Sequence, residues 1–451
     1  MTRTGLALAA LITGTLLAPL NSSMVAVALT PIGREFGLPL GTATWVVTVF
    51  YLTACVCQPV LGRVADRIGP RRLFTAGLTV AAVASAAAAT AGSVPALILC
   101  RGLQAAGVAA AFPCAVLVIR RGTGELGTAR LAAVATANTT AGAVGPVLGG
   151  LLTAWAGWQA VFWVNLPLML GALLLAWRAI GPDEPRPRTG GAIRALDPAG
   201  VLLFAAAVVG LLDLMLGFSW PAAALFAVAT TGFLWWERRA ATPFVDVRAL
   251  AATPGLVAVL ATFLLFNLAY YGAFYGLPPW LQTTLGYDAA QAGLLVMPIA
   301  ATSVVATVLG GPVTRRLGVG RALLFAGALL PVGVSALATF GPSTPAWLIV
   351  LDGIVLGIPY GLCNLGLQRL MYERAPEQMS GVVAGLFQST RYVGAILAVG
   401  VVGATAPRSP GSPPDLRVLA IAMTAVAALM LCSLRLVDGS RSKPGLLPRV
   451  L

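Results

Sequence analysis

The sequence predicts an all-α protein that crosses a membrane many times, and three observations support this fold class. Hydrophobic residues make up 58% of the 451 residues, charged residues make up 10%, and the mean hydropathy is +0.89. Long apolar runs recur along the whole chain, and the cationic residues are confined to short clusters between them. Such a composition leaves too little polar surface to cover a soluble globule of this size, so the lipid bilayer is the expected solvent.

The membrane-spanning helices are predicted from the apolar runs, because about 20 mostly apolar residues are needed to cross ~30 Å of hydrocarbon. Fourteen runs are long enough, and they lie at 6–30, 42–61, 73–92, 95–119, 128–155, 158–178, 198–216, 219–236, 254–277, 289–311, 321–340, 345–368, 380–404 and 416–436. The first run continues beyond the length of a secretory signal, which favours an uncleaved first helix. The separations around Gly157 and Ser219 are short, so hydropathy alone leaves counts of twelve or thirteen open.

The distribution of positive charge predicts that both termini lie in the cytoplasm. With fourteen spans and the N-terminus inside, all but five of the 29 lysine and arginine residues fall in cytoplasmic segments. The exceptions are Arg34, Arg408 and Arg417 in external loops, and Arg101 and Arg391 within spans. A missing or additional span in the middle of the chain would destroy this bias, so the charges support the count of fourteen.

Two longer polar segments and an internal repeat divide the chain into three parts. The segments at 181–197 and 237–248 bracket two spans, and the first has the proline content and mixed charge of a flexible cytoplasmic linker. Gly62–Gly69, after the second span, aligns with Gly311–Gly318, after the tenth. We therefore predict a six-helix bundle at 1–180, the linker with two inserted helices at 181–250, and a second six-helix bundle at 251–451.

The composition excludes several functional classes. Histidine is absent, which removes histidine-based acid–base and nucleophilic catalysis. The six cysteines lie in apolar runs without the spacing of metal ligands, so we expect no metal site and no disulfide framework. They are Cys55, Cys57, Cys100, Cys114, Cys363 and Cys432. We also expect that the protein is not an enzyme. The net charge of +14 does not indicate nucleic-acid binding, because the cations lie in clusters that set topology rather than on one face.

The strongest motif is a glycine-rich basic loop between the second and third spans. It contains Gly62, Asp66, Arg67, Gly69, Arg71 and Arg72. The glycines permit a tight turn with close helix approach, and a carboxylate among arginines can pair with a neighbouring helix end and its dipole. Charges that set topology would explain the arginines but not Asp66 and the spaced glycines. We therefore interpret the loop as a latch that stabilises one conformation.

Further motifs lie within or next to the spans. The 95–119 span contains Arg101-Gly-Leu-Gln104-Ala-Ala-Gly107, and the 158–178 span starts with Trp158-Gln-Ala-Val-Phe-Trp-Val-Asn165-Leu-Pro167. The 128–155 span contains Gly145, Pro146, Gly149 and Gly150. A proline with small neighbours in a spanning helix produces a bend and a tight helix contact.

Together with the glycine-rich basic loop, these segments resemble the signature motifs of the major facilitator superfamily and, in combination, its fourteen-helix drug:proton antiporter branch. The resemblance covers the whole chain, with Ala105 where the branch usually has glycine. It implies two six-helix bundles that rock about a midplane site, plus two inserted helices. It also implies outward movement of a small organic compound with the proton gradient as energy source and no cofactor. We expect a multi-pass monomer in the inner membrane of a bacterium.

One position departs from the branch. Asn21 stands in the first span where many members carry aspartate. Asparagine cannot titrate, so a candidate proton carrier is missing there. Two roles remain for Asn21, a hydrogen bond to the substrate and a structural hydrogen bond to a facing helix.

Charged residues within the spans are functional candidates, because inserting each one costs about 2.5–3.5 kcal/mol. Four residues qualify, Arg101, Asp213, Asp352 and Arg391. Arg101 and Asp352 lie at similar depth in spans that the repeat makes equivalent, which predicts an ion pair across the cavity or a purely structural pair. Asp352 is the predicted proton carrier, with Arg101 adjusting its protonation. Asp213 is the second candidate, although it lies toward the end of an inserted span and can reach the interface.

Seven residues are predicted to line the substrate cavity, namely Asn21, Gln104, Asn267, Tyr271, Phe274, Gln388 and Arg391. In the 254–277 span, Asn267, Tyr271 and Phe274 share one helical face with Tyr275. An aromatic wall with a few polar groups suits a moderately hydrophobic organic compound. Alternatively, Tyr275 and Trp280 belong to an aromatic belt at the outer interface.

These observations predict an efflux antiporter. Two alternatives remain open. The first is a facilitator or importer of small metabolites, and the second is a lipid translocator or membrane scaffold without ion coupling.

Overall fold

The computed structural model describes residues 3–122, 126–183, 197–216, 219–241, 243, 245, 247–374, 380–407 and 413–439. Helices account for almost all of these residues, and no strand occurs among them. Most of the predicted linker, at 184–196, lies outside the described residues, as does the side chain of Asp66.

Eighteen α-helices and one short 3-10 helix occur in the described residues. The N-terminal half contains α1 (Arg3–Glu35), α2 (Leu40–Ala43), α3 (Trp45–Ile68), α4 (Pro70–Ala89), α5 (Val94–Ala109), α6 (Ala111–Gly122), α7 (Leu126–Ala156), α8 (Ala160–Trp163) and α9 (Asn165–Ala179). The connecting part contains α10 (Pro198–Leu216), α11 (Trp220–Glu237) and α12 (Val247–Ala251). The C-terminal half contains α13 (Pro254–Thr284), α14 (Ala289–Leu317), α15 (Val319–Ala336), η2 (Leu337–Thr339), α16 (Ala346–Arg374), α17 (Ser380–Thr405) and α18 (Leu416–Gly439).

Twelve helical segments of the described residues are long and apolar enough to cross a membrane. Some are single helices, such as α1 and α13, and others are continuous pairs, such as α5 with α6. Helices α7 and α11 occupy the predicted spans at 128–155 and 219–236 but are not among the twelve. The predicted multi-pass all-helical architecture is therefore confirmed, whereas the predicted number of fourteen spans is not.

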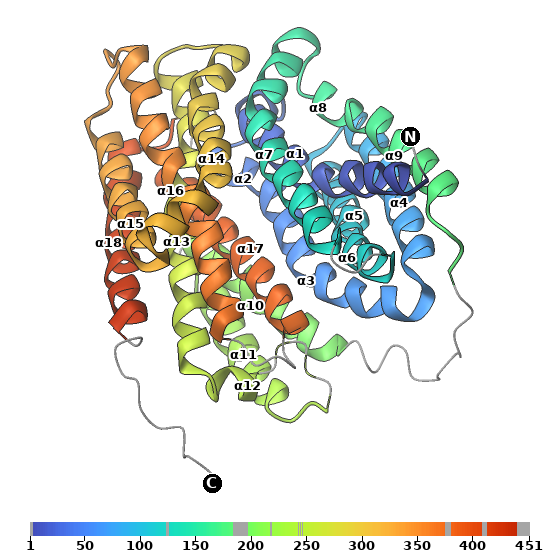
Figure 1. Cartoon of the computed structure of the whole chain (residues 1–451). Helices are drawn as coiled ribbons and strands as arrows, with labels where there is room; N and C mark the ends of the chain where they lie inside the picture. Colours follow the sequence, from blue (N-terminus) through green and yellow to red (C-terminus); the bar gives the residue numbers. More distant parts are fainter. Residues whose placement is uncertain are drawn as a thin grey trace.

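The helices form two groups. Figure 1 shows α1 to α9 on one side, α13 to α18 on the other, and α10 to α12 at the lower edge. In the first group α1 packs along α7 and α9, and in the second group α14 packs along α16 while α13 packs along α17 and α18. The groups meet where α7 packs against α14 and where α17 packs against α3.

The aligned segments of the internal repeat share an unusual backbone conformation. Gly69 lies between α3 and α4 with φ 98° and ψ 140°, and Gly318 lies between α14 and α15 with φ 81° and ψ 152°. A positive φ is disfavoured for residues with a side chain, so both turns require glycine. The third helix of each predicted bundle therefore starts from the same kind of turn.

Candidate functional site

A cavity of about 920 Å³, the central cavity, lies between the two halves. Its walls come from α1, α3, α5, α6 and α7 of the N-terminal half and from α13, α14, α16 and α17 of the C-terminal half. The volume is in the range of pockets that hold drug-sized organic molecules. Because both halves contribute walls, any movement of one half against the other changes the cavity.

Aromatic side chains from five helices line the central cavity. They are Phe50 and Tyr51 on α3, Phe112 on α6, Tyr270, Tyr271 and Phe274 on α13, Tyr360 on α16 and Tyr392 on α17. The rings of Tyr270 and Tyr360 stack with centroids 4.3 Å apart, and those of Tyr51 and Tyr392 are 5.7 Å apart. The hydroxyls of Tyr271 and Tyr360 lie 3.3 Å apart. The wall is therefore apolar on its ring faces and carries hydrogen-bonding groups at its tips.

Arg391 on α17 brings a positive charge into this wall. Its Nη2 donates a hydrogen bond to Oδ1 of Asn364 at 3.2 Å, and its Cζ lies 5.9 Å from the ring centroid of Phe263. Its Nε is covered by protein atoms and has no hydrogen-bond partner, and no described carboxylate forms an ion pair with Arg391. Its Nη1 has no hydrogen-bond partner among the described residues, so the guanidinium group has a donor to offer a molecule in the cavity.

Contacts between the halves shut the central cavity at one end, the closed end, where α1 and α13 terminate. The hydroxyls of Tyr51 and Tyr275 lie 2.8 Å apart, and the Tyr275 hydroxyl donates to the carbonyl of Ser22 at 3.2 Å. Gln282 Nε2 donates to the carbonyl of Val27 at 3.0 Å. These bonds tie α13 to α1 and α3. Tyr275 is 1% exposed, so it belongs to this contact and not to an aromatic belt.

Trp280, the other candidate for the belt, is buried as well. It is 4% exposed, and its ring lies 6.0 Å from that of Phe340, centroid to centroid. Trp280 is therefore a packing residue of the C-terminal half, whereas Tyr275 bonds that half to the N-terminal half.

Glycines on α7 allow close approach at the same end. A Cβ at Gly149 would lie 2.6 Å from the carbonyl oxygen of Met24 on α1, and a Cβ at Gly150 would collide with the carbonyl of Ala289 on α14. Pro146 lies inside the helix, between these contacts and its N-terminal part. The structure thus contains the tight contact predicted from this motif, and the contact joins the two halves.

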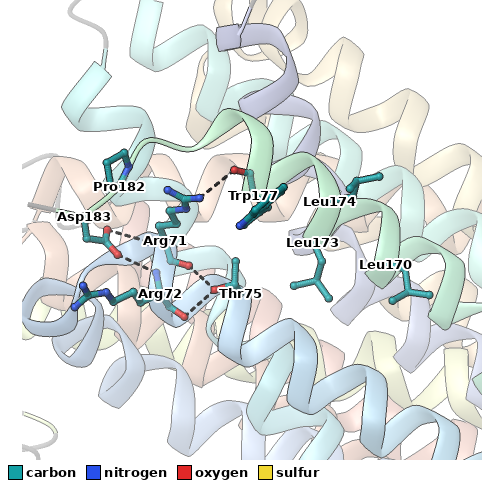
Figure 2. Close-up of a pocket in the computed structure, with 9 residues that line it drawn as sticks. All are labelled: Arg71, Arg72, Thr75, Leu170, Leu173, Leu174, Trp177, Pro182 and Asp183. Carbon is teal, nitrogen blue, oxygen red and sulfur yellow. Dashed lines mark hydrogen bonds between the residues drawn. The ribbon is translucent and has the colours of Figure 1, made fainter.

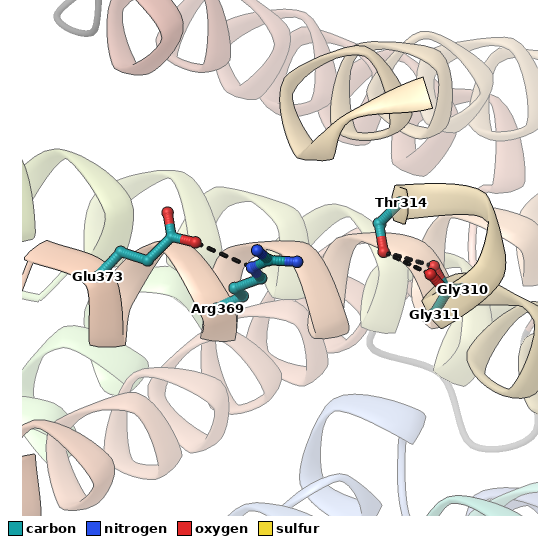
Figure 3. Close-up of polar contacts among 5 residues, drawn as sticks. All are labelled: Gly310, Gly311, Thr314, Arg369 and Glu373. Atoms are coloured by element: carbon teal, nitrogen blue, oxygen red, sulfur yellow. Dashed lines mark hydrogen bonds and ion pairs between the residues drawn. The ribbon is translucent and has the colours of Figure 1, made fainter. Parts of the chain in front are cut away.

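The central cavity reaches solvent at the opposite end, the open end, where α16 terminates. Arg369 and Glu373 line the mouth and form an ion pair of 2.9 Å, with side chains 56% and 43% exposed (Figure 3). On the neighbouring α14, the Thr314 hydroxyl donates to the carbonyls of Gly310 and Gly311 in its own helix. The structure is therefore closed at one end and open at the other.

Arg101 does not line the central cavity but lies in a buried network of the N-terminal half. Its Nη1 donates to Oδ1 of Asn21 at 2.5 Å and to Oε1 of Gln104 at 2.6 Å. Its Nε donates to the carbonyl of Val46 at 3.1 Å, and its Cζ lies 4.3 Å from the ring centroid of Phe50. The structure therefore brings three predicted site residues together, in a network that holds α1, α3 and α5 in place.

The predicted ion pair between Arg101 and Asp352 is not formed in this conformation. Asp352 on α16 is 5% exposed, its Oδ2 has no hydrogen-bond partner, and it does not line the central cavity. The ion pair between the described residues Arg369 and Glu373 involves neither of them. The second carboxylate candidate, Asp213 on α10, is exposed.

The N-terminus of α4, within the glycine-rich basic loop, is capped by a carboxylate from the segment after α9 (Figure 2). The backbone N–H groups of Arg71 and Arg72 donate to the two oxygens of Asp183 at 3.1 and 2.9 Å. Arg71 Nη2 donates to the carbonyl of Trp177 at 3.0 Å. The loop is therefore bonded to α9, along a hollow of about 660 Å³.

The other members of this loop lie on α3 or in the turn. A Cβ at Gly69 would collide with Asp183, and a Cβ at Gly62 would lie 3.6 Å from Pro113 on α6. Arg67 is exposed near the end of α3. The carboxylate predicted to pair with a helix end is thus supplied by Asp183, while the side chain of Asp66 lies outside the described part of the structure.

The structure places four of the seven predicted residues in the walls of the central cavity. These are Tyr271, Phe274, Gln388 and Arg391. The other three, Asn21, Gln104 and Asn267, are buried elsewhere. Asn267 donates to the carbonyl of Phe263 in its own helix at 2.7 Å, and Gly394 of α17 packs against its side chain. On α7, Gly145 faces Ser23 of α1 and not the cavity.

Several lining residues were missed by the sequence analysis. They include Tyr51, Gln58, Asn138, Tyr360, Asn364 and Tyr392. A polar or phenolic side chain within an apolar span was the available signal. That signal does not show which way a side chain points, and helix packing decides this.

Comparison with known proteins assigns the family. The family model of the Major Facilitator Superfamily matches residues 11–399, which is most of the chain. The chain belongs to the Major Facilitator Superfamily and is a multi-pass transporter of the bacterial inner membrane, not an enzyme.

Individual relatives resemble the chain over most of its length. It is 36% identical to the uncharacterized transporter YwoD of Bacillus subtilis, over 88% of this chain and 89% of the relative. It is 29% identical to the tetracenomycin C resistance and export protein of Streptomyces glaucescens, over 88% and 74%. A crystal structure of a mutant of the nucleoside transporter NupG superposes with a TM-score of 0.62 at 14% identity, over 96% and 99%. The latter likeness shows the fold alone.

Proposed function

We propose that the protein exports a small organic compound in exchange for protons, by exposing the central cavity alternately to the two sides of the membrane. The observation that carries the proposal is the cavity itself, which is closed at one end and open to solvent at the other. A secondary transporter needs such a site between two halves that can rock against each other. The aromatic lining suits an organic compound and not an inorganic ion.

The outward direction is supported by the relatives. One is named a resistance and export protein, and several others at 27–28% identity are named multidrug or antibiotic-resistance proteins. With the N-terminus in the cytoplasm, the open end faces the cytoplasm, because α1 then terminates outside. The described conformation is accordingly the one that would capture a compound for export.

We further propose fourteen spans with both termini in the cytoplasm. Helix α7 has 31 residues, which at ~1.5 Å per residue makes it longer than ~30 Å of hydrocarbon. Helix α11 has 18 residues and packs along α10. If α7 and α11 are both counted as spans, the cationic clusters fall on the cytoplasmic side of the membrane. Cysteine labelling from outside the cell tests this proposal, because Ser343 should react and Thr189, in the linker outside the described residues, should not. Labelling of Thr189 from outside would contradict the count.

Proton coupling is assigned to Asp352. A buried carboxyl group without an ionic partner can take up and release a proton when its surroundings change between conformations. Asn21 cannot replace it, since it is neutral and serves as acceptor for Arg101. Asp213 is exposed on α10 and does not line the central cavity. A single chain without a cofactor suffices, because it contains both walls of the cavity and the proton gradient supplies the energy.

Transport driven by a pH gradient tests the proposal. A screen of toxic compounds against overexpressing and deletion strains supplies the compound, and the protein is then reconstituted into liposomes with an acidic lumen. We expect the compound to accumulate above its external concentration while its addition makes the lumen more alkaline. Nigericin, which dissipates the pH gradient, should abolish the accumulation. Uptake that stops at equal concentrations would indicate a facilitator and contradict proton exchange.

A further inference from the structure

We infer that the central cavity selects planar aromatic compounds that carry an acidic group, and that Arg391 binds this group. The inference rests on the proposed function, since it names the substrate class of the same site. It follows from the charge balance of the lining, the free donors of Arg391 and the surrounding rings.

The charge balance of the lining is positive. The charged residues that line the cavity within the described part are Arg369, Glu373 and Arg391. Arg369 and Glu373 compensate each other at the solvent-exposed mouth. Arg391 lies deeper, on α17 among the aromatic side chains, and its charge is not compensated by any described lining carboxylate. The interior of the cavity therefore attracts a negative group.

The geometry of Arg391 fits an acidic group of a ligand. A guanidinium group carries five N–H donors in a planar fork that matches the oxygens of a carboxylate or phenolate. Among the described residues, Asn364 accepts a hydrogen bond from Nη2, Nε is covered by protein atoms, and Nη1 has no hydrogen-bond partner. The bond to Asn364 fixes the orientation of the fork and leaves donors for a bound oxyanion. A hydrogen-bond donor deep in the cavity is costly to leave unpaired once a ligand has displaced water, so a ligand acceptor stabilises the site.

The neighbouring rings define the rest of the ligand. Tyr270 stacks on Tyr360 at 4.3 Å, and Tyr271 and Tyr51 stand 6.2 Å apart, centroid to centroid. Flat π-surfaces on α3, α13 and α16 favour a flat aromatic ligand, which can stack on one ring and meet another with its edge. The paired hydroxyls of Tyr271 and Tyr360 offer additional hydrogen bonds to a phenolic or carbonyl oxygen.

Aromatic rings also attract cations, so an organic cation must be considered. That attraction competes here with repulsion from Arg391, which is strong in a cavity of low dielectric constant. A cation would also lack a carboxylate partner, because the only described one is Glu373 at the mouth, bonded to Arg369. The lining therefore favours acidic aromatic compounds over cationic ones.

Two xanthene dyes of similar shape and opposite charge test the inference. Fluorescein is the anion, and tetramethylrhodamine methyl ester is the cation. Their affinities are measured by fluorescence polarisation on the full-length protein in phosphatidylcholine nanodiscs, with empty nanodiscs as background. The wild type should bind fluorescein at least about tenfold more tightly than the cation, as one charge-assisted contact in a buried site allows.

Substitutions test whether Arg391 causes the preference for fluorescein over the rhodamine ester. Arg391→Gln should weaken fluorescein binding about tenfold and remove the preference. The matched control is Arg321→Gln on α15, an exposed arginine that does not line the cavity, and this variant should retain the preference. Arg391→Lys keeps the charge but loses the fork, so fluorescein binding should weaken while the preference for the anion persists. This variant keeps the test informative if Arg391→Gln does not fold.

Three results would overturn the inference. They are equal or tighter binding of the rhodamine ester by the wild type, no binding of fluorescein, and an unchanged preference after Arg391→Gln. Binding requires no gradient, so this outcome is independent of whether transport proves to be coupled to protons. A fluorescein preference without proton-driven accumulation would reject the proposed coupling but retain the substrate class.

Discussion

Arg101 combines full burial with the lack of an acidic partner among the described residues. A buried cation is normally stabilised by a carboxylate, because desolvation of the charge is costly. Here three neutral oxygens and the ring of Phe50 take over that role. Of the two roles that the sequence left open for Asn21, the structure supports the structural one.

Substitutions at Asn21 test this role. Asn21→Leu leaves a buried guanidinium donor without its acceptor, which should cost about 1–3 kcal/mol and lower the melting temperature of the purified protein. Asn21→Asp keeps an acceptor of the same shape and should melt at or above the wild-type temperature. Equal melting temperatures for Asn21→Leu and the wild type would show that this hydrogen bond is not important.

The proposed proton carrier is tested by a pair of isosteric variants. Asp352→Asn should abolish accumulation of substrate against its gradient, because the side chain can no longer exchange a proton, while substrate counterflow persists. Asp213→Asn changes an exposed group and should transport like the wild type. If Asp352→Asn still concentrates the substrate, the coupling assignment is wrong.

At the scale of single elements, the start of α4 depends on a residue distant in sequence. Two backbone N–H groups at its first turn are satisfied by Asp183 and not by a residue of the loop itself. A carboxylate at a helix N-terminus also interacts favourably with the helix dipole. The loop that connects α3 to α4 is thereby coupled to the end of α9.

Removal of the Asp183 carboxylate should destabilise the first turn of α4 and the glycine-rich basic loop. Asp183→Ala should cost about 0.5–2 kcal/mol and increase amide exchange at the first turn of α4. Asp415 caps α18 in a similar way, through the N–H groups of Arg417 and Val418, so Asp415→Ala is the matched control. We expect hydrogen–deuterium exchange in α4 to rise only in Asp183→Ala. Unchanged exchange there would mean that Asp183 does not hold the loop.

At the closed end, α7 and α14 approach each other closely, and this contact joins the two halves. Gly150→Leu would collide with the carbonyl of Ala289, so the halves should no longer meet and coupled transport should fall at least about tenfold. A Cβ at Gly171 on α9 would have no neighbour within 4 Å, which makes Gly171→Leu the control. The measurement is gradient-driven uptake together with the passive proton leak. Wild-type transport by Gly150→Leu would show that this contact does not close the cavity.

The fold and the site differ in how far the sequence predicts them. Span positions depend on local apolar length, so helices occur at all the predicted runs even where α7 and α11 are not among the candidate spans. Which residues line the central cavity depends on how each helix is rotated about its own axis. Asn267 and Tyr271 are four residues apart on one face, yet α17 covers Asn267 through Gly394 while Tyr271 reaches the cavity.

At the scale of the whole molecule, alternating access requires the two halves to move against each other, so that the closed end of the central cavity opens while the open end closes. The repeat offers equivalent positions for measuring this exchange. Ser93 and Ser343 are exposed and precede the aligned helices α5 and α16 at the closed end. Ile68 and Leu317 are 47% and 50% exposed and precede Gly69 and Gly318 at the open end. Each pair therefore reports the separation of the two halves at one end.

Distances between spin labels at these two pairs test alternating access most directly. The labels are placed in an active variant without the six native cysteines, and the distances are measured at acidic and alkaline pH with and without the transported compound. We expect a second population in which the Ser93–Ser343 distance is longer and the Ile68–Leu317 distance is shorter. Distances that stay constant under all conditions, or that lengthen or shorten together, would contradict alternating access of the central cavity.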